Sequence, residues 1–98
     1  MLRVLIRATP DTDVDAEADK LRGAAEKGGL QPGLIDRIVD EANTVVQDFV
    51  NRGRELQGLG SQLRAERAIR GDGYEIRVSF ETIPRSGLLG RFLAALRR

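Results

Sequence analysis

The feature that most constrains the fold is a long apolar stripe in the middle of the chain. Its positions step by three or four residues, and all but one are apolar: Ile35, Ile38, Ala42, Val45, Phe49, Arg52, Leu56, Leu59 and Leu63. Side chains at this spacing lie on one face of an α-helix. Pro32 suits the first turn of a helix, and Gly53 and Gly58 weaken its end. We therefore predict a long amphipathic helix over residues 33–57.

The residues before this stripe predict one strand and one shorter helix. Residues 2–8 alternate between apolar and basic side chains, which is the pattern of a half-buried strand, although Leu5 breaks the alternation. Asp13 is suited to cap the helix that follows, and glycine ends it at position 28. We predict a strand over residues 2–8 and a helix over residues 13–27.

Two alternating segments after the stripe predict a β-hairpin over residues 63–82. We expect a two-residue type I′ turn at Asp72 and Gly73. The resulting register pairs apolar with apolar side chains and basic with acidic ones: Arg70 with Glu75, Ile69 with Ile76, Ala65 with Phe80, and Arg64 with Glu81. A shift of one residue would move every side chain to the other face. Arg67, opposite Val78, is the one misfit on the inward face.

The last segment predicts an amphipathic C-terminal helix over residues 86–97. One side is apolar and consists of Leu88, Leu89, Phe92, Leu93 and Leu96. The segment carries no acid. Its basic residues are Arg91 and Arg97, and Arg85 and Arg98 lie directly before and after it. Such a helix completes a small core, fills a groove of a partner protein or lies on an anionic membrane surface. These three alternatives remain open at the level of the sequence.

The predicted elements define an α+β fold. Their order is β-α-α-β-β-α in a single domain over residues 1–98. We expect a three-stranded, mainly antiparallel sheet with the long amphipathic helix packed on one face. Whether the first strand lies beside the second or the third is open.

The composition excludes several classes of function. The chain contains neither Cys nor His, which excludes disulfides, Cys or His metal sites, thiol nucleophiles and imidazole catalysis. Its 15 acidic residues fall at helix caps, in turns and on polar faces. We therefore expect no catalytic, metal or cofactor-binding residues, no small-molecule substrate and no enzymatic activity. No apolar run approaches the roughly 20 residues of a membrane span, so we expect a cytoplasmic protein.

Three short motifs have a better structural explanation. The acidic run at residues 11–15 begins like a calcium loop, but Ala16 and Arg22 stand where that loop needs Gly and Glu. The adhesion tripeptide at residues 70–72 coincides with the hairpin turn. The paired glycines at positions 58 and 60, and at 71 and 73, lack the frame of a phosphate-binding loop.

The length of the long helix suggests self-association. A helix of this length spans about 40 Å, whereas strands of a small sheet span about 17–25 Å. We expect the surplus apolar positions, Val46, Val50, Leu56 and Leu59, to pack against a second copy in a homodimer. The leading hypothesis is a non-enzymatic protein interaction or regulatory module that uses the long and C-terminal helices.

A charge asymmetry supports an alternative. Residues 1–49 carry a net charge of −4 and residues 50–98 one of +5, although the whole chain is only +1. In this alternative the basic C-terminal helix docks the domain on an anionic membrane surface or on nucleic acid.

Overall fold

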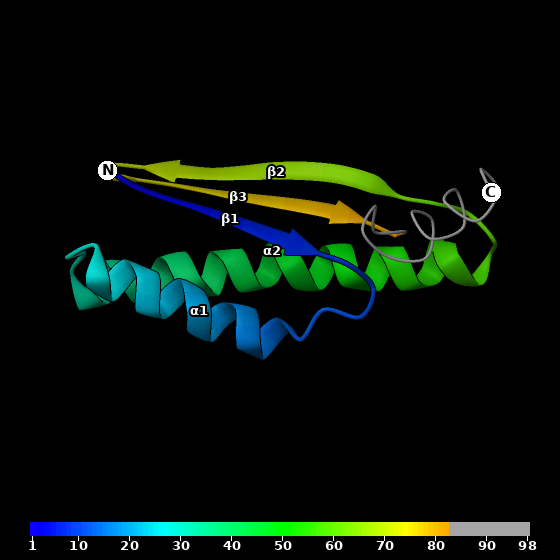
Figure 1. Ribbon diagram of the computed structural model, residues 1–98, viewed down its shortest axis with the longest axis horizontal. Coiled ribbons are helices and arrows are strands. Elements are labelled where there is room, and N and C mark those ends of the chain that lie inside the picture. Colours follow the sequence, from blue (N-terminus) through cyan, green and yellow to red (C-terminus); the bar gives the residue numbers. More distant parts are fainter. Residues whose placement is uncertain (83–98) are drawn as a thin grey trace, which may run out of the picture.

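The protein folds into two layers, a sheet and a pair of helices that cover one of its faces (Figure 1). A computed structural model describes residues 1–82. Its elements are β1 (Leu2–Ala8), α1 (Val14–Lys27), α2 (Pro32–Gly58), β2 (Arg64–Gly71) and β3 (Tyr74–Glu81). The predicted C-terminal helix at 86–97 lies outside the described residues. No helix in the described part has an apolar stretch sufficient to cross a membrane.

Helix α1 begins and ends at the residues that the sequence indicates. The Asp13 carboxylate accepts a hydrogen bond from the Ala16 N–H at 3.2 Å, which satisfies one of the open donors of the first turn. Gly28 is the C-cap, and Gly29 follows with a φ of +76°, a conformation that favours glycine. Leu21 and Ala25, on the predicted apolar face, are buried.

Helix α2 is the predicted long helix, extended by one residue at each end. It has 27 residues, which corresponds to about 40 Å. Its apolar stripe is buried against the sheet as far as Val50. At Gly53 the helix backbone lies so close to β3 that a Cβ atom would overlap the ring of Phe80.

The sheet is mixed, so the prediction of a mainly antiparallel sheet is correct for the hairpin pair and wrong for the pairing of the first strand. The strand order is β1-β3-β2, with β1 parallel to β3 and β2 antiparallel to β3. Each element reverses the direction of the one before it, so β1 and β3 run the same way (Figure 1). The parallel pair follows because β1 lies beside β3. The central position suits β3, since its inward residues are all large and apolar, whereas β2 carries Arg67.

The hairpin has the predicted register but a different turn. Arg70 lies opposite Glu75 and Ile69 opposite Ile76, and the pairing continues to Arg64 and Glu81. Among residues 1–82, no residue other than glycine has a positive φ, so Asp72 does not adopt the conformation of a type I′ turn. Gly73 has a φ of +83°, which is the conformation that a type II turn requires at its second central residue.

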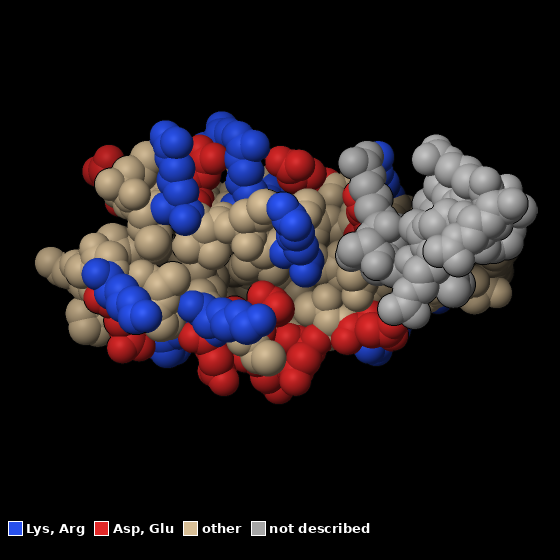
Figure 2. All heavy atoms as spheres, in the orientation of Figure 1, with Lys and Arg blue, Asp and Glu red and all other residues tan. Residues whose placement is uncertain are grey.

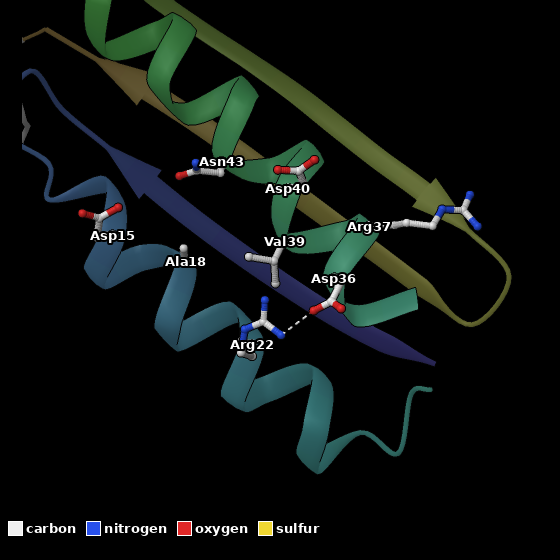
Figure 3. A pocket seen from close by; sticks show the side chains of 8 residues that line it. All are labelled: Asp15, Ala18, Arg22, Asp36, Arg37, Val39, Asp40 and Asn43. Atoms are coloured by element: carbon white, nitrogen blue, oxygen red, sulfur yellow. Dashed lines mark hydrogen bonds and ion pairs between the residues drawn. The ribbon is translucent and has the colours of Figure 1, made fainter. Parts of the chain in front are cut away.

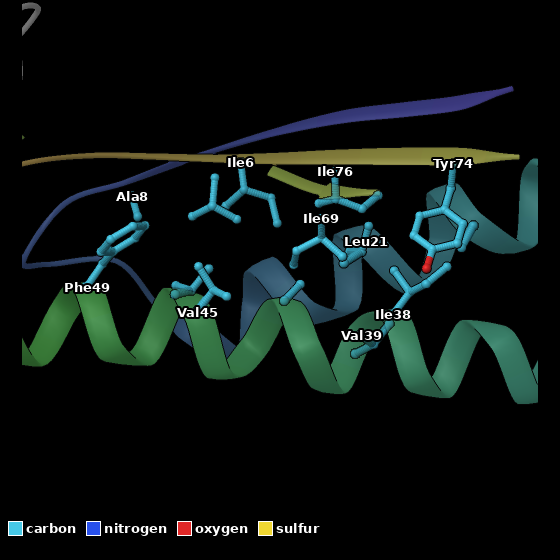
Figure 4. Packing of buried hydrophobic residues seen from close by; sticks show 14 of the residues in the cluster. Ile6, Ala8, Leu21, Ile38, Val39, Val45, Phe49, Ile69, Tyr74 and Ile76 are labelled. Atoms are coloured by element: carbon cyan, nitrogen blue, oxygen red, sulfur yellow. The ribbon is translucent and has the colours of Figure 1, made fainter. Parts of the chain in front are cut away.

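The core lies between the sheet and the two helices (Figure 4). Ile76 and Val78 of the central strand are fully buried, and Ile6 of β1 and Ile69 of β2 lie beside them in the sheet. The rings of Phe49 on α2 and Phe80 on β3 contact each other with centroids 5.8 Å apart. The opposite face of the sheet is covered by no element of the described chain (Figure 1).

Candidate interaction surfaces

The helical side of the molecule carries a groove between α1 and α2 (Figure 3). Arg22 of α1 donates a hydrogen bond to the Asp36 carboxylate of α2 at 2.7 Å, and this contact raises the pKa of Arg22. Asp15, Asp40 and Arg37 also line the groove. All five side chains point toward solvent or toward one another. The ion pair of Arg22 with Asp36 connects the two helices at the surface of the molecule.

Asn43 lies at the floor of the same groove. Its Oδ1 atom is buried and accepts no hydrogen bond from the described residues. Apolar side chains of the helix interface, including Ala18, Leu21 and Val46, line the small space beside it. A buried acceptor of this kind costs about 1–3 kcal/mol when it is left without a partner.

All 15 acidic residues lie within the described chain, and none of them is buried. A catalytic carboxyl usually depends on burial to raise its pKa. Glu75 is shifted the other way: a hydrogen bond from Arg77 and the charge of Arg70 lower its pKa. Within residues 1–82, no group of three His, Cys, Asp or Glu residues could hold a metal ion.

The outer face of the sheet, defined here as the face turned away from the helices, carries a network of ion pairs. The Glu75 carboxylate accepts a hydrogen bond from Arg77 through Oε1 at 2.9 Å and forms an ion pair with Arg70 through Oε2 at 3.2 Å. Arg64 pairs with Glu81 at 3.3 Å. The pairs of Arg70 with Glu75 and of Arg64 with Glu81 join β2 to β3, whereas Arg77 and Glu75 both lie on β3. No carboxylate of the described chain lies within 4 Å of Arg3 or Arg7 on β1.

A second exposed region is the end of α2 that extends past the sheet. Leu59 is 74% exposed there, and Leu56 is half-buried. Arg54 donates a hydrogen bond to the Pro10 carbonyl at 3.0 Å, which ties this end of α2 to the segment after β1. We define Leu56 and Leu59 as the α2 end patch.

The structure separates the four residues that the sequence proposes for self-association. Val46 and Val50 are 2% and 1% exposed, because both pack inside their own chain. They offer no surface to a partner. The expectation that they contact a second copy is therefore corrected, because the rest of the chain covers this part of α2. Leu56 and Leu59 are the two of the four that reach the surface.

The residues proposed for partner or anionic-surface contact lie outside the described residues. They are Leu88, Leu89, Phe92, Leu93, Leu96, Arg85, Arg91, Arg97 and Arg98. Their roles remain predictions from the sequence.

An exposed leucine within β1 is missing from the predicted sites. Leu5 is 52% exposed on the outer face, between Arg3 and Arg7. The sequence contained its signal, because Leu5 is the residue that breaks the alternation of the first strand.

Comparison with protein-family models, curated proteins and solved structures finds no match for this chain.

Proposed function

We propose that the chain is a non-enzymatic protein interaction module that self-associates through the α2 end patch. The observation that carries the proposal is the 74% exposure of Leu59, the C-cap residue of α2, at the end of the helix that extends past the sheet. An exposed large apolar side chain gains free energy when a second copy covers it.

The path of the chain supports a larger contact at this end. Thr82, the last described residue, donates a backbone hydrogen bond to the Leu63 carbonyl at 3.0 Å. The Ser61 N–H in turn donates to the Leu56 carbonyl at 2.8 Å. Residues 83–98 therefore begin at the same end of the molecule as the α2 end patch. The five apolar residues in the predicted C-terminal helix would add the area that two leucines lack, since stable interfaces bury about 1,200–2,000 Å².

The electrostatics of the described chain also favour binding over catalysis. Its carboxylates are accessible to water, and neighbouring arginines lower the pKa of Glu75 and hold it ionised. Such groups serve as ion-pair partners and not as proton donors near neutral pH.

The proposal is tested by sedimentation velocity of the full chain at micromolar concentrations. We expect the wild-type chain to sediment as a dimer and the Leu59→Asp variant as a monomer, because the new charge would be buried in the contact. The matched control is Leu5→Asp, which places the same charge at the other exposed leucine and should remain dimeric.

Two results would contradict self-association at this site. One is a wild-type chain that is monomeric at every concentration, as when residues 83–98 cover the α2 end patch within one chain. The other is an equal loss of dimer in the Leu5→Asp and Leu59→Asp variants.

A further inference from the structure

The backbone of β1 has one edge that no other strand uses. The Leu2 N–H donates to the Gly73 carbonyl at 2.8 Å, so the backbone groups of Leu2 point toward β3. Because these directions alternate along a strand, the N–H and C=O groups of Arg3, Leu5 and Arg7 point away from β3. Within residues 1–82, no backbone or side-chain group outside the sheet bonds to them.

The two outer strands of the sheet differ in how they are protected. On β2, Arg67 points to the helical side and is exposed, and the outer face of the same strand carries the charged residues Glu66 and Arg70. A charge on the inward face of an edge strand hinders the addition of another strand. The inward residues of β1 are all apolar, and Leu2 and Val4 are only half-buried. The edge of β1 is therefore better suited than the edge of β2 to pair with an added strand.

The outer face of β1 has a charge pattern of its own. Arg3 and Arg7 are exposed and flank Leu5, whereas Arg64, Arg70 and Arg77 on the neighbouring strands are paired with glutamates. In the view of Figure 2, charged side chains lie along the upper and lower parts of the molecule, and one basic side chain also reaches into the largely uncharged middle. The sheet thus presents two exposed positive charges on either side of an apolar residue. Arg7 has no carboxylate of the described chain within 4 Å, whereas Arg3 lies opposite Glu75 and helps to lower its pKa without a direct ion pair.

We propose that the free edge of β1 binds an extended acidic segment of a partner protein as a fourth strand of the sheet. Opposite Arg3, Leu5 and Arg7, the added strand would carry an acidic, an apolar and an acidic side chain at alternate positions. Its intervening residues would be apolar, because they lie on the side of half-buried Leu2 and Val4. The backbone hydrogen bonds supply affinity, and the two arginines select the charge.

A second copy of this chain fits the same edge poorly. Antiparallel pairing of two β1 strands centred on Leu5 sets Arg3 of one chain opposite Arg7 of the other, and like charges directly opposite are destabilising. Nucleic acid also fits poorly, since the outer face of β1 offers no aromatic side chain for base stacking. The α2 end patch shares no residue with this edge, so the two proposals are independent.

The test uses a synthetic peptide and the full chain. The five central residues of the peptide are glutamate, valine, leucine, valine and glutamate, flanked by serines, and binding is followed by fluorescence anisotropy. We expect the variant Arg3→Glu/Arg7→Glu to bind at least about tenfold more weakly, because two attractive pairs become repulsive. The same peptide with lysine in place of glutamate should bind this variant better than it binds the wild type.

Controls separate strand addition from general charge attraction. Arg37→Glu/Arg52→Glu makes the same change in net charge on exposed positions of α2 and should leave peptide binding unchanged. A peptide with proline at its central position should not bind, because proline removes a ladder hydrogen bond. Leu59→Asp should bind normally, which distinguishes failure of this proposal from failure of self-association.

Amide hydrogen exchange, measured by NMR, locates the bound strand. We expect the peptide to slow exchange at Arg3, Leu5 and Arg7 and to leave the outer edge of β2 unchanged. Protection of β2 instead, equal binding of the proline peptide, or tighter binding of an oligothymidine than of the acidic peptide would overturn the proposal.

Discussion

At the scale of single residues, Gly53 shows how closely α2 approaches the sheet. Ala normally stabilises a helix interior relative to Gly by about 0.5–1 kcal/mol. At Gly53, however, the added methyl group would overlap the ring of Phe80, which is itself buried against Phe49. We expect Gly53→Ala to lower the free energy of unfolding by about 1–3 kcal/mol in urea denaturation.

Gly23→Ala is the matched control for this substitution. Gly23 lies within α1, and a Cβ atom there would have no neighbour within 4 Å. The same chemical change should therefore raise stability by about 0.5–1 kcal/mol. If both variants were stabilised, the close approach of α2 to Phe80 would be wrong.

Two residues that break the sequence pattern, Leu5 and Arg67, lie exposed on the outer strands. The sequence identifies both as misfits but cannot say why they are tolerated. The reason is strand order, because Arg67 can reach water only if β2 lies at an edge. Strand order depends on long-range contacts that local alternation does not encode.

At the scale of elements, the ion pairs on the outer face of β2 and β3 make stability depend on pH. The hydrogen bond from Arg77 and the charge of Arg70 lower the pKa of Glu75 in the folded state. The resulting stabilisation is fully present above the ordinary value of 4.5, and it is lost as the pH falls through the lower pKa of the folded protein.

Glu75→Gln should therefore be less stable than the wild type at pH 7, and the difference should shrink as the pH falls below 4.5. Urea denaturation at several pH values measures this difference. Arg77→Gln removes the same hydrogen bond from the other side and should reduce the pH dependence in the same direction. A constant difference between wild type and Glu75→Gln would contradict this role for Glu75.

The hairpin separates what local sequence determines from what it does not. Its register was predictable because a shift of one residue would misplace every apolar side chain. The turn type was not, since a two-residue loop ending in glycine is compatible with both type I′ and type II geometry. The negative φ of Asp72 avoids the left-handed conformation that type I′ would impose on it.

At the scale of the whole molecule, the relation between α2 and the sheet determines which apolar residues remain exposed. The prediction compared about 40 Å of helix with shorter strands and assigned the surplus to Val46, Val50, Leu56 and Leu59. The helix is indeed longer than the strands, but the part of α2 that extends past the sheet is its C-terminal end. The eight residues of β3 span about 26 Å and cover α2 beyond Val50, as the contact between Phe80 and Gly53 shows.

The central claim is that two copies of the chain meet at the α2 end patch. The absence of Cys makes a direct measurement possible, because a single introduced thiol has no competitor. Ser61→Cys places the thiol beside the α2 end patch, and Asp72→Cys places it in the hairpin turn at the opposite end of the molecule (Figure 1). Cross-linking with a short bis-maleimide should give a covalent dimer of Ser61→Cys and leave Asp72→Cys monomeric. Equal cross-linking at both positions, or none at Ser61→Cys, would contradict the account.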